Sequence, residues 1–223
     1  YSHGRAGVDS FFGNGRISVD GYSLSGSATW SGNNGFYVDG QAQATWYNSD
    51  LTSDTIGRRL TSDNNGFGRA FSIESGQRLA LNETWSVTPQ VQLVYSSVSF
   101  DDFTDPFGAH VTRDKSDSLT SRLGVSLDYN TAWRDAAGHT ARANVYGLAN
   151  VYYDFRGGTA VNVSDTVLSS RADRAWAGVG VGGAVTWNDD RFGLYGQVLV
   201  RSSLQGSGNG HDYRATVGAR VRW

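Results

Sequence analysis

Cysteine and methionine are both absent from the 223 residues, and proline occurs only twice. Without cysteine the chain can form no disulfide bond and no thiolate metal site. Without methionine, Tyr1 is not the start of a primary translation product, so we expect a processed product or a fragment of a longer chain. No stretch approaches the roughly 18 consecutive apolar residues of a transmembrane helix. The formal net charge of -2 argues against a nucleic-acid partner, for which a basic surface is expected.

Glycine and aromatic residues are abundant instead. The chain has 29 glycines, and 13% of its residues are aromatic, a composition that suits many strands joined by turns. The mean hydropathy of -0.40 is typical of a soluble protein. It does not exclude a transmembrane β-barrel, because alternating apolar and polar residues cancel in any hydropathy window.

The last eleven residues show the clearest pattern. Every second residue from Tyr213 to Trp223 is apolar, and the residues between them are polar, cationic or small. Successive side chains of a strand point to opposite faces, so one face is apolar with an aromatic residue at each end. A transmembrane barrel needs strands of roughly 9–11 residues with this pattern. A half-buried strand of a soluble β-sandwich would alternate in the same way, so this stretch leaves both classes open.

Similar alternation recurs along the chain and predicts nine strands plus the tail of one more. The tail lies in residues 1–15, and the strands cover residues 22–30, 36–47, 67–76, 85–95, 119–129, 141–155, 175–187, 194–201 and 213–223. Long polar connections at 48–65, 97–118 and 156–173 alternate with short ones, and residues 206–210 lie within the last loop before the terminal strand. Alternation of short periplasmic turns with longer extracellular loops is typical of outer-membrane barrels.

The aromatic residues of the apolar face follow the same alternation. At the short-turn ends or the C-terminus lie Trp30, Phe36, Trp85, Tyr129, Trp187 and Trp223, and toward the long-loop ends lie Trp46, Tyr153, Phe155 and Tyr213. A soluble sandwich has no reason to sort aromatic residues by loop length. The pattern therefore predicts an all-β, antiparallel transmembrane barrel with two aromatic girdles.

Charged residues fall mostly on the polar face. We predict a pore lining made of Glu74, Arg122, Asp128, Asp154, Arg201, Arg214, Arg220 and Arg222. Each would cost roughly 2–4 kcal/mol if it faced lipid at the membrane midplane. Inside a lumen these charges can hold the wall by pairing, or can line a polar conduit or plug-binding surface; the two roles are compatible. Arg69 is the exception, because it falls on the apolar face near a long connection, where an arginine can snorkel to the interface.

No chemical site is predicted, and no cofactor. The four histidines, His3, His110, His139 and His211, lie in loops or near strand ends, where solvated surface is the simpler interpretation than a metal site. A Ca²⁺ site from Asp101, Asp102 and Asp105 is less favoured than a charged loop. His211-Asp212 could suggest a hydrolase, but no Gly-x-Ser-x-Gly motif accompanies it. The glycines 178, 180, 182 and 183 lie in a strand with no helix after it, unlike a phosphate-binding loop.

Several short motifs, in order and spacing over nearly the whole chain, resemble the C-terminal translocator domain of type Va autotransporters. They are Asn34–Asp39, Glu74–Gly76, Trp85 with Pro89-Gln90, Arg122–Gly124, Tyr146–Phe155 and the terminal alternation. The resemblance is to the pertactin-like group, close to the Bordetella serum-resistance autotransporter. The terminal residues Tyr213, Val217, Ala219, Val221 and Trp223 resemble the signal that the barrel assembly machinery reads.

The resemblance implies a 12-stranded, monomeric barrel in the Gram-negative outer membrane, with extracellular loops and a periplasmic C-terminus. Such a barrel anchors an N-terminal passenger and assists its export, and a linker helix threads the lumen. Tyr1 would then fall within the family's third strand, and the terminal strand is not expected to pair with residues 1–9 or 16–30. Some members cleave themselves in the barrel. They use an Asn on the linker and acidic residues on the wall. Glu74 is the one wall acid that we match to that activity, and the linker is not among the residues of this sequence. A small porin or adhesin and a ten-strand surface protease are the alternatives.

Overall fold

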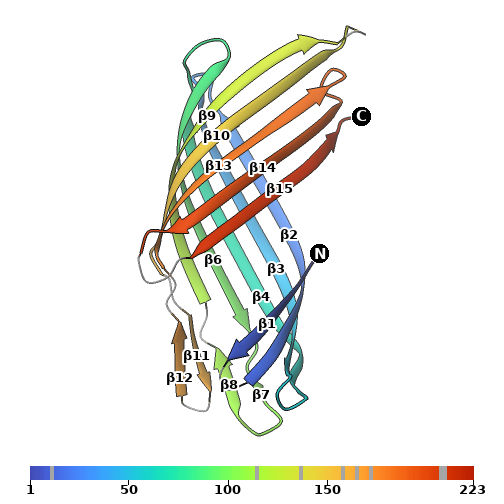
Figure 1. Ribbon diagram of the computed structural model, residues 1–223, viewed down its shortest axis with the longest axis vertical. Helices are drawn as coiled ribbons and strands as arrows, with labels where there is room; N and C mark the ends of the chain where they lie inside the picture. The colour runs from blue at the N-terminus through green and yellow to red at the C-terminus, as the bar shows by residue number, and fades with distance from the viewer. Residues whose placement is uncertain are drawn as a thin grey trace.

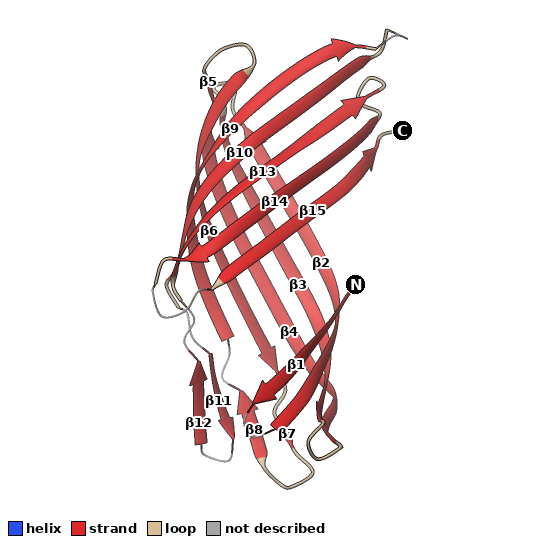
Figure 2. Cartoon of the chain, in the orientation of Figure 1, coloured by secondary structure: helices blue, strands red, loops and turns tan. Residues whose placement is uncertain are grey.

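A computed structural model describes residues 1–10, 13–113, 116–135, 138–156, 159–163, 166–170, 173–205 and 210–223. Every regular element in these ranges is a β-strand, and all of the strand pairs are antiparallel. Within the described part of the chain no helix has the length and apolar character to cross a membrane. The predicted all-β, antiparallel fold class is therefore confirmed (Figure 2).

One sheet, eleven-stranded over the described residues, makes the wall of the molecule. Its ten principal strands lie in chain order: β1 (Ser2–Ser10), β2 (Gly13–Ser31), β3 (Phe36–Ser53), β4 (Arg58–Gln77), β6 (Trp85–Phe100), β9 (Ser116–Arg134), β10 (Thr140–Asp154), β13 (Ala175–Trp187), β14 (Phe192–Ser203) and β15 (His211–Val221). The two-residue β5 (Leu79–Ala80) pairs with β6 at one end. Figure 1 shows the strands tilted and the sheet strongly curled.

A second sheet is built from two of the long connections. It has the order β12-β11-β8-β7, where β7 is Phe103–Thr104, β8 is His110–Arg113, β11 is Thr159–Val163 and β12 is Thr166–Ser170. β8 follows β6 and β11 follows β10, so pairing between β8 and β11 joins loops that are far apart in the sequence. Figure 1 places this sheet beyond the long-loop end of the wall.

The predicted number and order of the wall strands are correct, but the predicted long loops are too long. Residues 48–65 form a hairpin. β3 continues to Ser53 and β4 begins at Arg58, so only a four-residue turn separates them. β6 runs to Phe100 and β9 begins at Ser116, so residues 97–118 are also largely strand. The reason is that strand pairing needs only backbone groups, and it continues after the apolar alternation has ended at the aromatic level.

Other connections differ from the prediction in smaller ways. Residues 1–15 contain the whole of β1 and the start of β2 rather than a strand tail and a loop, and residues 156–173 contain β11 and β12. The predicted loop at 206–210 lies mostly outside the described residues. The irregularity predicted at Pro89 is present: the β4–β6 ladder stops at Gly76–Gln90, and β5 resumes the pairing at Val87. Proline donates no ladder hydrogen bond, so the interruption falls where it costs least.

The two edges of the wall are β1 and β15. Among the described residues β1 pairs with β2 and β15 with β14, and neither edge pairs with the other. The curled sheet therefore has an open side, and completion of the wall by further strands stays a prediction.

Candidate functional site

Burial in this molecule is inverted relative to a soluble domain. In the described part of the chain only Ala141 and Leu199 are buried hydrophobic residues. The buried polar residues are more numerous: Thr45, Ser49, Asn64, Ser86, Thr88, Ser97, Ser126 and Asn150. Large apolar side chains are instead exposed, with Leu24 at 70%, Leu123 at 63% and Val217 at 85%. Such an apolar exterior is stable in lipid and unstable in water.

Aromatic side chains meet in pairs at both ends of the apolar outer face. At the short-turn end the ring centroids of Trp30 and Phe36 lie 6.2 Å apart, and those of Trp85 and Tyr129 lie 5.1 Å apart. Trp187 stacks on Phe192, which the girdle prediction had missed, at 6.0 Å. These distances suit favourable offset and edge contacts, so the rings stabilise the hairpin ends as well as one another.

The opposite end has the same arrangement. Trp46 lies 5.8 Å from Phe67, and Tyr153 lies 5.1 Å from Phe155. Arg69 is exposed and lies two residues after Phe67 on β4, on the same outward face, as its place in the alternation predicts. The aromatic pairs thus border the apolar zone at both ends.

A triad on the inner face links three strands. The Tyr37 hydroxyl donates to Glu74 Oε1 at 2.6 Å, and Arg122 Nη2 donates to Glu74 Oε2 at 2.5 Å. The Glu74 and Arg122 side chains are only 18% and 17% exposed. Two predicted pore residues therefore meet in an ion pair that ties β4 to β9, and Tyr37 extends the contact to β3. The triad holds the wall in register from inside.

Hydroxyl and amide groups hold the other inner acids of β9 and β10. Asp128 accepts from Ser126 on the same strand, and Asp154 accepts from Ser118 of β9 at 2.9 Å. The Tyr146 hydroxyl of β10 reaches over the intervening β13 and donates to Gln197 Oε1 of β14 at 2.8 Å. The predicted residues Asp128 and Asp154 therefore stay separate from the Glu74 pair and bond locally.

Arg201 links the last two strands and reaches β10. Its Nε donates to Asp212 Oδ2 at 2.8 Å, and its guanidinium lies 5.3 Å from the Tyr152 ring centroid. Asp212 was considered only as part of a hydrolase motif; the sequence signal that would have found this pair is the inward position of both residues on neighbouring strands. Arg214 lines a concavity of about 550 Å³ together with residues of β2, β3, β4 and β6, so it faces the opposite wall of the lumen.

The glycines of β13 make room for large inner side chains of its neighbours. A Cβ on Gly182 would lie 2.5 Å from the Tyr146 ring, and one on Gly178 would lie 3.0 Å from Arg201. The space above these glycines is therefore filled by aromatic and cationic side chains from adjacent strands.

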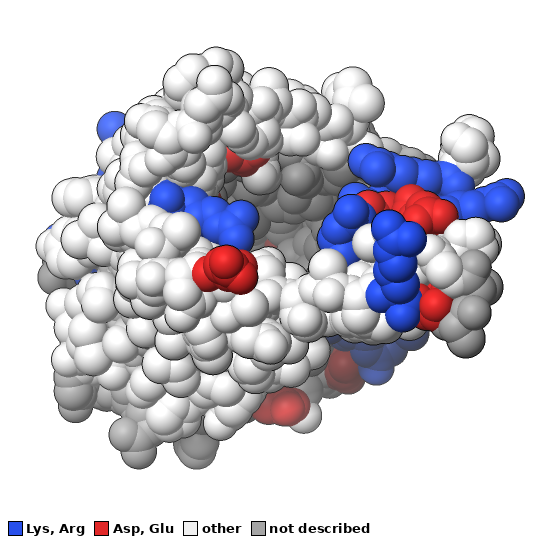
Figure 3. All heavy atoms as spheres, turned by 90° about the horizontal axis from the view of Figure 1, so that it is seen from above, with Lys and Arg blue, Asp and Glu red and all other residues white. Residues whose placement is uncertain are grey.

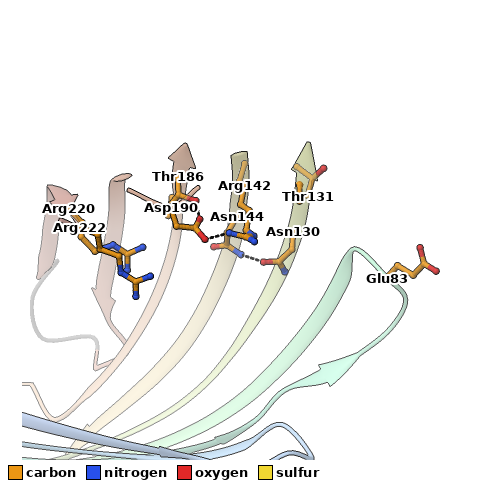
Figure 4. A pocket seen from close by; sticks show the side chains of 12 residues that line it. Glu83, Asn130, Thr131, Arg142, Asn144, Thr186, Asp190, Arg220 and Arg222 are labelled. Carbon is orange, nitrogen blue, oxygen red and sulfur yellow. Dashed lines mark hydrogen bonds and ion pairs between the residues drawn. The ribbon is translucent and has the colours of Figure 1, made fainter. Parts of the chain in front are cut away.

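The short-turn end of the lumen opens into a charged concavity of about 470 Å³. Figure 3 looks down on this end and shows basic and acidic side chains around a central hollow. In Figure 4, Arg142 pairs with Asp190, and Asn144 Nδ2 donates to Asn130 Oδ1 at 3.0 Å. Asp190 also accepts from Thr186 at 2.6 Å.

Two predicted pore residues, Arg220 and Arg222 of the last strand and its end, line the same concavity (Figure 4). Sequence reasoning missed Arg142 and Asp190. Asp190 lies in a turn, where three consecutive residues, Asn188, Asp189 and Asp190, have positive φ of 53°, 55° and 64°. The position of the Asp190 carboxylate at the short-turn opening of the lumen depends on this unusual turn. The alternation of apolar and polar residues does not predict such a turn.

The neighbouring Asp189 fixes the same turn against the β9–β10 connection. It accepts from the Thr140 backbone N–H and lies 2.9 Å from His139 Nδ1. The Thr140 amide, followed by His139, holds the pKa of the Asp189 carboxyl below its usual value. His139 is thus in contact with a carboxylate at the surface.

Two more of the residues considered for chemistry, His3 and Asp105, are also engaged locally. His3 Nδ1 lies 2.8 Å from Asp20, and Asp105 accepts from the Phe107 and Ala109 amides in its own turn. Over the residues that the structure describes, no group of three His, Asp or Glu residues converges as a metal site.

Comparison with known proteins agrees with this architecture. The autotransporter beta-domain family matches residues 1–198. The adhesin BmaC autotransporter of Brucella suis is 42% identical over 216 residues, which is 97% of this chain and 6% of that protein. The pertactin autotransporter of Bordetella bronchiseptica is 27% identical over 198 residues, which is 87% of this chain and 21% of that protein. The chain thus spans only a small part of these relatives.

Solved structures show the same fold at low identity. The transport unit of the autotransporter AIDA-I from Escherichia coli superposes with a TM-score of 0.72 at 18% identity, over 94% of this chain and 68% of that one. The beta domain of the Bordetella autotransporter BrkA gives a TM-score of 0.67 at 19% identity, over 95% of this chain and 76% of that one. The chain belongs to the autotransporter beta-domain family, whose members are outer-membrane proteins of Gram-negative bacteria.

Proposed function

We propose that this chain forms the wall of an outer-membrane translocator, which anchors an N-terminal passenger and assists its passage to the cell surface. The inverted burial carries the proposal: exposed Leu24, Leu123 and Val217 require lipid outside, while buried Ser86 and Ser126 border the interior. We assign no catalytic step to the chain.

The orientation proposed is short turns and C-terminus in the periplasm, and long loops outside the cell. Loop length supports it, because outer-membrane barrels have short periplasmic turns and longer extracellular loops. The second sheet, formed by β7, β8, β11 and β12, then stands on the extracellular side.

The inner charges support a hydrated path rather than a dry core. Arg214, Arg220 and Arg222 face the lumen or its periplasmic mouth, where water can solvate them. We propose that Glu74, Arg122, Asp128, Asp154 and Arg201 mainly hold the wall, and that the three arginines of the last strand contact the linker or passenger in transit.

The terminal strand is proposed as the signal for the barrel assembly machinery. Its outward residues Tyr213, Val217 and Trp223 are highly exposed, at 73%, 85% and 105%, so they are available to another protein before insertion. The surface-protease alternative is not favoured, because Asp212 is held by Arg201 and no second acid lies with His211 in the described residues.

A protease-accessibility experiment tests the proposal on the full-length protein in a Gram-negative host. Protease added to intact cells should cleave an epitope placed in the N-terminal region, and Trp223→Ser should reduce both surface exposure and the heat-modifiable barrel band. An epitope that stays protected while the barrel is folded in the outer membrane would overturn the proposal. An open ion conductance of the full-length protein, unblocked by any upstream segment, would favour a porin instead.

A further inference from the structure

Asparagine is followed by glycine at four places in the sequence, and the structure puts three of these pairs in different surroundings. Asn14-Gly15 and Asn65-Gly66 lie within wall strands β2 and β4, whereas Asn34-Gly35 lies in the turn between β2 and β3. Asn209, of the fourth pair, is outside the described residues. The backbone nitrogen after an asparagine can attack the side-chain carboxamide, and glycine hinders this attack least because it has no Cβ. The three pairs thus share one chemistry and differ in how the fold restrains it.

The carboxamide of Asn34 is held beside the glycine that follows it. Asn34 is exposed, and its Oδ1 accepts from the Phe36 backbone N–H at 3.1 Å. A bond to the second amide after Asn34 keeps the carboxamide alongside the intervening Gly35 peptide. The Phe36 N–H also stabilises the negative charge that develops on Oδ1 when the Gly35 nitrogen attacks Cγ, because a backbone donor already directed at that oxygen needs no rearrangement.

The Asn34–Gly35 peptide is weakly restrained. Ring closure requires this peptide to rotate about the bond between Cα and the carbonyl carbon of Asn34. Two hydrogen bonds oppose the rotation: the Gly35 N–H donates to the Gly32 carbonyl oxygen at 3.2 Å, and Gln77 Nε2 donates to the Asn34 carbonyl oxygen at 2.6 Å. The first is long, and the second comes from a side chain. Local opening of an exposed turn costs less free energy than opening of a paired strand.

The other two described pairs are restrained by the wall itself. Gly15 has a ladder partner on β1 and another on β3, and Gly66 has one on β3 and another on β6. Rotation of either peptide would break strand pairing on both sides. The fold therefore protects these two asparagines and leaves Asn34 able to react.

We propose that Asn34 is a modification site, at which the fold selects one asparagine–glycine pair for spontaneous deamidation. The Gly35 nitrogen gives its proton to solvent base and bonds to Asn34 Cγ. The Cγ–Nδ2 bond then breaks, and Nδ2 takes up a proton and leaves as ammonia. Water opens the resulting succinimide at either of its two carbonyl carbons, giving aspartate or isoaspartate. One water is consumed and one ammonia is released, with no oxidation or reduction.

Deamidation would change the contact between two connections at the short-turn end. Gly35 has a φ of 84°, and its carbonyl oxygen accepts from the Arg78 N–H at 2.8 Å. Isoaspartate adds one carbon to the main chain directly before Gly35, so it displaces this carbonyl from Arg78. Either product also adds a carboxylate to a concavity of about 500 Å³ that Arg78 and Glu83 line.

Peptide mapping by mass spectrometry tests the site on the full-length protein, folded in detergent micelles at mildly alkaline pH. The peptide that contains Asn34 should gain aspartate and isoaspartate with time, and isoaspartate distinguishes the cyclic route from direct hydrolysis of the carboxamide. The peptides that contain Asn14 and Asn65 should react at least about tenfold more slowly, because ring closure there breaks more than one ladder hydrogen bond. In concentrated urea, which removes the strand pairing, the three rates should become similar.

Three variants locate the reaction and its restraint. Gln77→Ala removes the side-chain donor from the Asn34 carbonyl oxygen and should speed conversion roughly two- to tenfold, the ratio that one net hydrogen bond supplies. Gln43→Ala makes the same change at a glutamine whose amide bonds Thr45, and should leave the rate unchanged. Asn34→Gln keeps a carboxamide but would have to close a larger ring, so conversion at this position should stop.

The unmodified protein alone can overturn the proposal. If the Asn34 peptide of the folded protein converts no faster than the Asn65 peptide, or gains aspartate without isoaspartate, Asn34 is not the selected site. A preference for Asn34 that is as large in urea as in the folded protein would assign the selection to local sequence rather than to the fold, and would overturn it as well. The measurement does not depend on export, so its failure would leave the translocator proposal standing.

Discussion

At the scale of single residues, the Glu74–Arg122 pair is the contact whose loss should matter most. Glu74→Gln leaves the Arg122 guanidinium, 17% exposed, without its carboxylate partner. We expect a loss of about 1–3 kcal/mol in unfolding free energy, below the value for a dry buried pair because lumen water can reach the site. Urea unfolding in micelles measures it. Combining Glu74→Gln with Arg122→Met should recover part of the loss; if the double variant is less stable than the single one, the pair does not hold the wall.

The Asp189 turn should make local stability depend on pH. The Thr140 amide and His139 lower the Asp189 pKa, so the contact stabilises the turn above the unfolded pKa of roughly 3.9 and is lost as pH falls through the lower folded pKa. Amide exchange at Thr140 should therefore be slower in the unmodified protein than in Asp189→Asn at pH 6. That difference should disappear at strongly acidic pH. A difference that is constant across this range would show that the carboxylate charge is not involved.

At the scale of the strand, close packing between β13 and its neighbours predicts a sharp difference between two glycines. A Cβ on Gly180 would lie 2.7 Å from the Val198 carbonyl oxygen, a backbone atom that cannot turn aside, whereas a Cβ on Gly147 meets nothing within 4 Å. Gly180→Ala should cost about 1–3 kcal/mol, and Gly147→Ala should be neutral or slightly stabilising. Thermal loss of the folded band on a gel compares them. Equal midpoints would contradict this account of the β13–β14 contact.

Alternation along the strand was enough to predict the wall, because lipid on one side and water on the other impose a period of two on every strand. It placed the ends of strands wrongly wherever both faces were polar, as in the hairpin that β3 and β4 form beyond Trp46. It also placed Glu74 and Arg122 on one face without pairing them. Pairing depends on register, and register depends on turns such as Asn188–Asp190, whose positive φ values follow no alternating pattern.

A pocket at the long-loop end of the inner face, lined in part by Ile17, Val19, Leu51 and Phe103, shows a further limit of the alternation rule. Ile17, Val19 and Leu51 are apolar on the inner face, so a rule of polar residues inward would assign them to the wrong side. The β7–β8 hairpin that closes the pocket lies in residues predicted as loop. Its contacts arise from chain segments that meet only after the wall has curled.

At the scale of the whole molecule, the inverted burial predicts opposite responses to one charge placed on the two faces. Val181 is at the centre of β13, 57% exposed on the outer face, and Thr216 of β15 is exposed on the inner face. Val181→Arg should cost about 2–4 kcal/mol in a bilayer, because the guanidinium would have to leave water near the midplane. Thr216→Arg keeps its charge in the hydrated lumen and should cost far less.

Unfolding by urea in lipid vesicles compares these two variants with the unmodified protein. The comparison should also be repeated in water-soluble amphipols or short-chain detergent, where water reaches the outer surface more easily. There the penalty of Val181→Arg should shrink while that of Thr216→Arg stays the same, since only the outer face changes its solvent. A larger penalty for Thr216→Arg than for Val181→Arg in vesicles would mean that the two faces have been assigned the wrong way round, and with them the lumen and every charge placed in it.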